Sequence, residues 1–179
     1  TKQWPVSDFT LAEIKRLDAG SWFDVKFAGA RVPTWQEAID LVRGKAGLFP
    51  ETKGPEVYGS RGFDMEKLVL AQLKKNNLPD AKTPVIIQSF SPESLTILRT
   101  QHQCKLPLVY LMGGSPSAQH ASPEGLQKVK AFADGIAPNK AVLLKQPELV
   151  KAAHDLGMSV TVWTFREKQT GMFPDVKSE

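Results

Sequence analysis

Short apolar runs alternate with longer amphipathic segments along this chain of 179 residues. The short runs are rich in Val, Ile and Leu and predict strands, whereas the segments between them repeat apolar residues three and four positions apart and predict helices. One strand is indicated weakly, at residues 135–136, and four are indicated clearly, at residues 46–53, 84–90, 106–112 and 159–165. This alternation is typical of an α/β protein with a parallel sheet.

Capping patterns mark where several of the predicted helices begin. Two capping boxes are present, in the pairs Thr10/Glu13 and Thr34/Glu37. Ser91 followed by Pro92 predicts a further helix start, because the serine hydroxyl accepts a backbone hydrogen bond and the first turn needs no N–H from the proline. The other helices are predicted at residues 63–76, 125–133 and 147–156.

The composition excludes several classes of protein. Lys and Arg number 23 and Asp and Glu 19, a net charge of +4, but the two signs are interspersed and form no basic stripe for nucleic acid. No apolar run is long enough for a membrane span, so no transmembrane segment is predicted. A single cysteine, Cys104, excludes an intrachain disulfide and a multi-cysteine zinc site. No protein partner is predicted.

The pattern of elements leaves two kinds of parallel sheet open. A doubly wound sheet often carries a glycine-rich phosphate turn, and neither GxGxxG nor GxxxxGK[ST] occurs in this sequence. The alternative is a (β/α)₈ barrel, which typically needs about 250 residues and more strands than the five found here.

Two charged residues at the end of the first strand are candidates for chemistry. Glu51 and Lys53 are two positions apart, so their side chains point to the same face of the strand. A carboxylate there can bind a hard divalent cation, and a lysine can contact a phosphate oxygen. The same spacing also suits a solvated salt bridge, which is the commoner outcome, so spacing alone leaves both interpretations open.

Five segments that cover nearly the whole chain carry a family resemblance: DFTLAEIKRLDAGSWFDVKFAGARVPTWQEAIDL, GLFPETKGP, VIIQSFSPESLTILR, LPLVYL and VTVWTFRE, in this order. Together they resemble the glycerophosphodiester phosphodiesterase family. The resemblance implies a TIM (β/α)₈ barrel, and hydrolysis of small glycerophosphodiester molecules to glycerol 3-phosphate and an alcohol. It also implies a divalent cation, Ca²⁺ or Mg²⁺, as cofactor.

The resemblance assigns roles to individual residues. Glu51 matches the family's third-strand metal ligand, and Lys53 matches the lysine that contacts the substrate phosphate. The other substrate-binding positions that it implies are Gln88, Ser89 and Phe90 of the QSF motif, Trp163 near the glycerol, and Arg166. Many relatives have asparagine where this chain has Arg166, which leaves the role of that residue open.

The family's remaining motifs are expected outside the sequence. The first-strand HRG motif, the following Glu-x-Asp pair and a second histidine would precede residue 1, and the eighth strand would follow residue 179. Residues 1–179 are therefore expected to form one partial barrel domain, about strands 3 to 7, that contains no catalytic residue and is inactive by itself. His102, His120 and His154 match no motif and are predicted at the surface or at helix ends.

Two other functions fit the same residues. One is a related barrel phosphodiesterase that acts on lysophospholipids or sphingomyelin, and the other is a noncatalytic phosphate-binding module. The TFR sequence at residues 164–166 resembles the branch that includes periplasmic enzymes. The expected location is therefore periplasmic or secreted, with cytoplasmic as the alternative.

Overall fold

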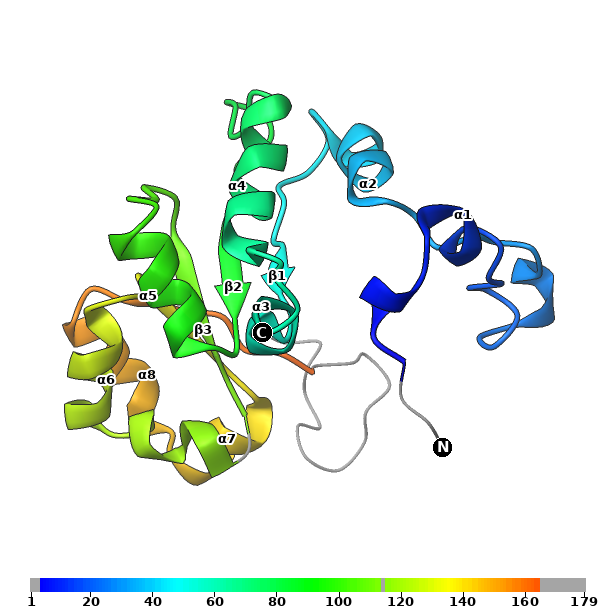
Figure 1. Ribbon diagram of the computed structural model, residues 1–179. Helices are drawn as coiled ribbons and strands as arrows, with labels where there is room; N and C mark the ends of the chain where they lie inside the picture. Colours follow the sequence, from blue (N-terminus) through cyan, green and yellow to red (C-terminus); the bar gives the residue numbers. More distant parts are fainter. Residues whose placement is uncertain (1–3, 114, 165–179) are drawn as a thin grey trace. The chain divides into compact units, whose positions relative to one another are not determined.

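The computed structural model describes residues 4–113 and 115–164, which form two compact units (Figure 1). The first unit comprises Thr1–Leu48 and Asp80–Thr83, and the second comprises Phe49–Pro79 and Pro84–Glu179. All five strands of the structure fall in the second unit, which therefore contains the candidate site.

The first unit is built from short helices. They are the 3₁₀ turns η1 (Val6–Asp8) and η2 (Val25–Phe27) and the helices α1 (Leu11–Ile14) and α2 (Trp35–Val42). Both predicted capping boxes are confirmed: in each, the threonine hydroxyl accepts the glutamate N–H and the glutamate carboxylate accepts the threonine N–H. These local bonds define where α1 and α2 begin, independently of tertiary packing.

Five parallel strands form the sheet of the second unit. They are β1 (Glu51–Thr52), β2 (Ile87–Ser89), β3 (Leu108–Met112), β4 (Gly135–Pro138) and β5 (Ser159–Val160), paired in that order. A strand is found at each predicted place, although β1 and β5 have two residues each and are much shorter than the predicted 46–53 and 159–165. Pro50, just before β1, has no N–H for the ladder and contributes only its carbonyl, which accepts the Gln88 N–H at 2.9 Å.

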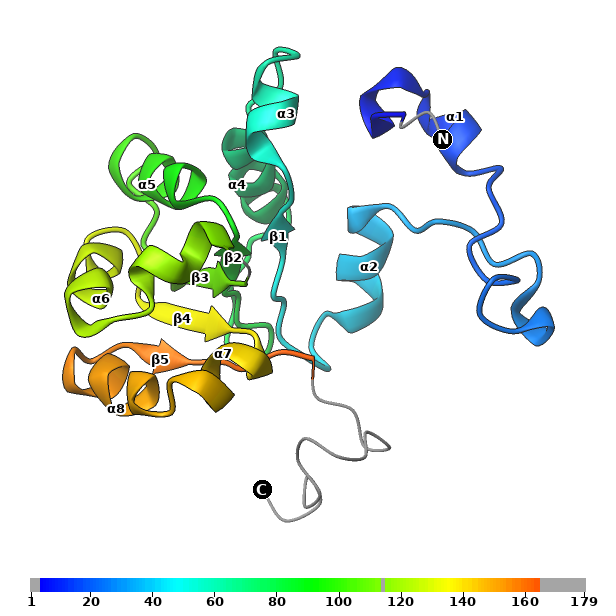
Figure 2. The same cartoon turned by 90° about the horizontal axis from the view of Figure 1, so that it is seen from below.

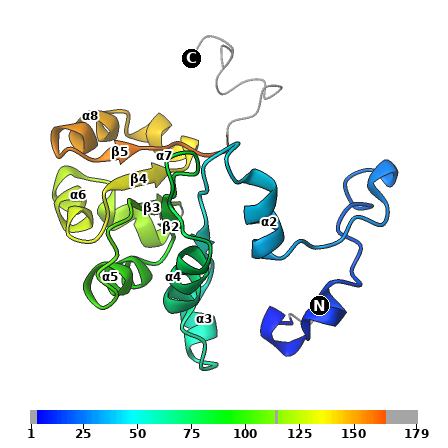
Figure 3. The same cartoon turned by 90° about the horizontal axis from the view of Figure 1, so that it is seen from above.

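Four helices follow the strands and cover one side of the sheet, as Figures 2 and 3 show. They are α4 (Met65–Lys75), α5 (Pro92–Thr100), α6 (Pro123–Lys130) and α8 (Glu148–Asp155). A doubly wound sheet reverses its strand order and has helices on both faces, whereas here the order is sequential and the helices share a side. The fold is therefore the barrel type, present in the described residues as an open set of five strands.

Besides η1 and η2 of the first unit, three elements of the second unit are not predicted by the periodicity. They are α3 (Pro55–Gly59), η3 (Ser115–His120) and α7 (Lys140–Lys145). Each is too short to repeat an apolar pattern, and η3 lies in a stretch that predicts a loop. Gly54, with φ of 61°, makes the left-handed turn that begins α3 immediately after Lys53.

Alternation along the strands separates two faces. On the helix side, strand residues such as Tyr110 and Ile136 are buried, as are apolar residues of the helices: Leu73, Leu95, Leu98, Leu126, Val129 and Leu149. On the opposite, concave side, Val109, Leu111 and Ala137 form a smaller apolar cluster. No helix in the described ranges is long and apolar enough to cross a membrane.

Candidate functional site

Glu51 and Lys53 meet at the carboxyl end of β1. The Lys53 Nζ atom lies 3.2 and 3.3 Å from the two carboxylate oxygens of Glu51, which confirms that both side chains point to the same face. The Glu51 side chain is 23% exposed and that of Lys53 is 80% exposed. A carboxylate and an ammonium group, both accessible to solvent, are thus presented together at the edge where parallel α/β barrels place their active sites.

Gln88 continues this face on the neighbouring strand. It is paired in register with Glu51, and in a parallel sheet residues in register point to the same side. Its side-chain Nε2 donates to the carbonyl of Phe49, 3.1 Å away, and so ties β2 to the segment that leads into β1.

Ser89 lies on the other side of the sheet. Its side chain is completely buried, its hydroxyl donates to the Thr52 carbonyl at 3.1 Å, and the same oxygen accepts the N–H of Ser91 at 3.1 Å. Because neighbouring residues of a strand alternate in direction, Ser89 does not share the face of Gln88 and Phe90. Its bonds hold the ends of β1 and β2 at a constant separation.

The aromatic side of the site comes from the ends of β2 and β5. The rings of Phe90 and Trp163 meet edge-on, with centroids 5.7 Å apart. The Trp163 indole N–H donates to the carbonyl of Ala137 at 2.8 Å, and its ring packs on the concave apolar cluster. The orientation of Trp163 is therefore determined by β4.

A small cavity of about 210 Å³ borders the two charged groups. Its walls are residues 51–56 after β1 together with Phe90 and Ser91 after β2. The structure thus brings Glu51, Lys53 and Phe90 to one hollow, with Gln88 beside Glu51 and Trp163 against Phe90. Arg166 lies outside the described residues.

Asn139 is a neighbour of this site that the sequence prediction missed. It follows β4, forms a bridge with Trp163, and its Nδ2 donates to the Thr164 hydroxyl at 3.3 Å. Its Oδ1 accepts the N–H of Ala141 and caps α7. The asparagine before the run Lys-Ala-Val-Leu-Leu was the available signal, since asparagine is a favoured N-cap residue.

The described histidines lie away from Glu51 and Lys53. His154 is exposed on α8, and His102 is 3.7 Å from Asp64, beyond the end of α5. His120 ends η3 but is buried, and its Nδ1 lies 3.2 Å from the Tyr110 hydroxyl. The sequence pattern places His120 in a polar loop at the surface, whereas the structure puts it at the end of η3 and buries it.

Glu51 is the predicted metal ligand on this face, and Glu56 is a second carboxylate residue in the wall of the same cavity. Within the described ranges, no group of three or more His, Cys, Asp or Glu side chains is arranged to hold a metal ion. Mg²⁺ and Ca²⁺ take six or more oxygen ligands, so Glu51 alone does not constitute a metal site.

The fold is of the α/β barrel type, in which catalytic groups lie at the carboxyl ends of the strands. The charged pair of Glu51 and Lys53 lies at such an end. The glycerophosphoryl diester phosphodiesterase family matches residues 1–176. A glycerophosphodiester phosphodiesterase of Bacillus subtilis is 35% identical over 162 residues, and one of Caldanaerobacter subterraneus is 32% identical over 165 residues. The chain therefore belongs to the glycerophosphoryl diester phosphodiesterase family, which confirms the resemblance found in its motifs.

The matches cover most of this chain but only part of each relative. The first alignment spans 84% of this chain and 53% of the Bacillus protein, and the second spans 92% and 62%. The chain thus covers between about half and three fifths of the length of these relatives.

Solved structures of low identity share the fold. A glycerophosphodiester phosphodiesterase from Parabacteroides distasonis superposes with a TM-score of 0.63 at 24% identity, over 88% of this chain and 59% of that one. An Oleispira antarctica phosphodiesterase, solved with the product sn-glycerol-3-phosphate, gives 0.64 at 22% identity, over 90% and 61%. These similarities support the barrel-type arrangement of β1 to β5.

Proposed function

We propose that the protein containing this sequence hydrolyses glycerophosphodiesters to glycerol 3-phosphate and an alcohol, with a divalent cation as cofactor. Family membership supports the reaction class. The single structural observation that carries the proposal is the contact between Glu51 and Lys53 at the carboxyl end of β1. It places one anionic and one cationic group where a phosphodiester would meet both a metal ion and an ammonium group.

Phosphodiester hydrolysis builds negative charge on the phosphoryl oxygens. A lysine ammonium group that contacts these oxygens stabilises that charge most where water is excluded. Lys53 is 80% exposed and its only described ion pair is with Glu51, so its ammonium group is accessible to a phosphate. In this proposal the weak ion pair between Glu51 and Lys53 breaks when the substrate and the cation bind. Glu51 then contacts the cation and Lys53 contacts the phosphate.

Glu51 is the proposed ligand of the cation, Ca²⁺ or Mg²⁺. A bound divalent ion supplies Lewis-acid stabilisation of the phosphoryl group. Since one carboxylate leaves most oxygen positions of such an ion unfilled, the proposal requires further ligands from outside the described residues. The half-buried position of Glu51 beside Gln88 suits this role, because its carboxylate is directed without being fully desolvated.

The other residues are proposed to shape the substrate site. Phe90 and Trp163 offer an apolar wall to the carbons of the glycerol moiety, and Gln88 offers an amide on the same face. Arg166 is proposed as a further substrate contact on the resemblance alone. Ser89, being buried on the helix side, would act by holding the ends of β1 and β2 together.

The direct test measures glycerol 3-phosphate released from glycerophosphocholine by the protein that contains this sequence, with Mg²⁺ or Ca²⁺ added. We expect Glu51→Gln to lower the rate at least about 100-fold, since a lost metal ligand has no substitute nearby. The matched control is Glu148→Gln, an exposed glutamate in the first turn of α8, which should leave the rate unchanged. An equal rate for both variants would contradict the role of Glu51. Phosphate binding without hydrolysis would instead favour a noncatalytic module.

A further inference from the structure

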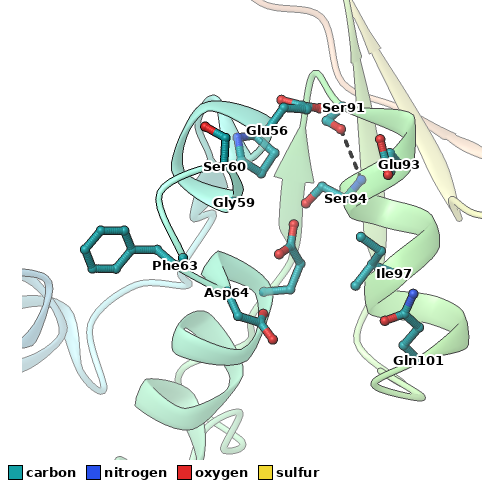
Figure 4. A pocket seen from close by; sticks show the side chains of 13 residues that line it. Glu56, Gly59, Ser60, Phe63, Asp64, Ser91, Glu93, Ser94, Ile97 and Gln101 are labelled. Carbon is teal, nitrogen blue, oxygen red and sulfur yellow. Dashed lines mark hydrogen bonds between the residues drawn. The ribbon is translucent and has the colours of Figure 1, made fainter. Parts of the chain in front are cut away.

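Asn139 does more than cap the helix that follows β4. A simple cap is seen after β2, where the Ser91 hydroxyl accepts the Ser94 N–H at 3.1 Å (Figure 4). In Asn139 the cap uses Oδ1, which accepts the Ala141 N–H at 2.9 Å. This bond determines which way the amide is turned, so that Nδ2 points away from α7 and is able to donate elsewhere.

The second bond of the Asn139 side chain connects it to Trp163. Nδ2 donates to the Thr164 hydroxyl at 3.3 Å, and this hydroxyl donates to the carbonyl of Trp163. The same carbonyl accepts the main-chain N–H of Lys140 at 3.4 Å. The Asn139 side chain is thus joined to the backbone of Trp163 through one hydroxyl group.

The end of β4 holds Trp163 at other points through main-chain groups. The indole N–H donates to the Ala137 carbonyl at 2.8 Å, and the main-chain N–H of Trp163 donates to the Pro138 carbonyl at 3.3 Å. Asn139 differs from these neighbours because it acts through its side chain. A substitution of Asn139 therefore alters the support of Trp163 without removing the main-chain bonds.

The backbone of Thr164 has a conformation that needs such support. Its φ angle is 72°, in the left-handed region that a β-branched residue rarely adopts. A conformation of this kind persists where the surrounding interactions hold it, and it is frequent near functional sites. Within residues 4–113 and 115–164, the side chain that bonds the Thr164 hydroxyl is that of Asn139.

We propose that Asn139 is a positioning residue for substrate binding, a role that rests on the proposed function. Through Thr164 it holds the ring of Trp163 against Phe90, so that the apolar wall for the glycerol carbons exists before the substrate arrives. The ring of Trp163 is only partly buried, so packing constrains it less than it constrains a core side chain. A wall that is already in place reduces the cost of ordering on binding.

Asn139→Ser tests this role in the protein that contains this sequence. Serine is an equally favoured N-cap, but its shorter side chain ends before Thr164, so the cap remains and the second bond is lost. We expect KM for glycerophosphocholine to rise about fivefold and kcat to stay within about twofold, because the wall contacts substrate and transition state alike. Thr164→Val removes the same bond from the other side and should have the same effect. The double variant should be no worse than either single variant.

Two further variants separate this role from a general loss of stability. Thr164→Ser keeps the hydroxyl and should recover most of the affinity that Thr164→Val loses. Thr100→Val is the matched control, because Thr100 is also exposed and its hydroxyl also donates to a backbone carbonyl, that of Thr96, at 2.7 Å. This control should leave KM unchanged.

Acrylamide quenching of Trp163 fluorescence measures the positioning without any substrate. Since the chain has four tryptophans, the signal of Trp163 is obtained by subtracting the spectrum of the same variant with Trp163→Phe added. Trp163 should be quenched more readily in Asn139→Ser and in Thr164→Val than in the wild type or in Thr100→Val.

Three results would each overturn this role of Asn139. They are unchanged quenching of Trp163 in Asn139→Ser, an unchanged KM in that variant, and effects of Asn139→Ser and Thr164→Val on KM that add in the double variant. If the wild type releases no glycerol 3-phosphate, the proposed function fails, whereas the quenching still decides whether Asn139 holds Trp163. The two failures are therefore distinguishable.

Discussion

The ring of Trp163 meets the ring of Phe90 at 87°, with 5.7 Å between their centroids. Phe90 follows β2 and Trp163 follows β5, and β3 and β4 lie between these strands in the sheet. The two rings therefore meet across the concave side, above the end of β3. Gly113, which follows β3, makes this possible because a Cβ atom there would lie 3.0 Å from Cζ2 of Trp163.

Gly113→Ala should disturb this contact between the rings. The new methyl group would also lie 3.7 Å from Cε1 of Phe90, so the indole must shift by a few tenths of an ångström. We expect a loss of about 1 kcal/mol in the free energy of unfolding and a raised KM in the phosphodiesterase assay. Urea denaturation and steady-state kinetics measure the two effects. Gly59→Ala is the control, since a Cβ there has nothing within 4 Å.

Lys53→Gln should raise KM for glycerophosphodiesters about tenfold or more, because it removes the ammonium group proposed to contact phosphate. Stability should change little, since the Lys53 side chain is 80% exposed and its ion pair with Glu51 is therefore weak. Lys151→Gln is a matched control: Lys151 is also 80% exposed and also paired with a carboxylate, that of Asp155. If both variants show the same KM as the wild type, Lys53 does not contact the substrate.

Thr52→Val should cost about 1 to 2 kcal/mol of stability, because it leaves a buried hydroxyl without a partner. The Thr52 and Ser94 hydroxyls are 3.0 Å apart and each residue is 1% exposed. Adding Ser94→Ala should recover part of the loss, since neither hydroxyl is then left unpaired. Chemical denaturation gives the free energies of unfolding of the wild type, the two single variants and the double variant, which together form a double-mutant cycle. Additive losses would show that the two hydroxyls do not interact.

The stability of the second unit should fall as the pH drops below about 6.5. Burial, together with the smaller effect of the Lys128 charge, lowers the pKa of His120 below its usual value of 6.5. The unfolded chain then binds more protons than the folded one in this range, so the contribution is complete above the unfolded pKa and is lost on acidification. Melting temperatures between about pH 5 and pH 8 should therefore drop less steeply in His120→Gln than in the wild type. His154→Gln, at an exposed helix position, should follow the wild type.

The 179-residue chain by itself should release no glycerol 3-phosphate from glycerophosphocholine, even with excess Mg²⁺ or Ca²⁺. None of its three histidines lies beside Glu51, and within the described residues no three His, Cys, Asp or Glu side chains are arranged to hold the cation. Metal-dependent release above the level of a Glu51→Ala control would contradict this prediction and show that the chain contains its own catalytic groups.

Local chemistry made many elements predictable. Three helix starts depend on residues only three positions apart: the capping boxes of Thr10 and Thr34 and the N-cap at Ser91. Because these contacts are local, the sequence predicts them without any knowledge of tertiary contacts. The spacing of Glu51 and Lys53 likewise guarantees a shared face on a strand. Short elements such as α3 and α7 gave no such signal, because one or two helical turns do not repeat an apolar pattern.

Sequence by itself determined the order of strands and helices, the family and the two charges at the end of β1, since these depend on local periodicity and on motifs. The tertiary structure alone decided how distant segments combine. It turned Ser89 to the helix side while Gln88 lies in register with Glu51, and it brought Trp163 over Gly113 onto Phe90. The reason is that strand register, sheet curvature and burial depend on which distant segments pack together. The spacing of residues along the chain determines only the face of a strand or helix on which each one lies.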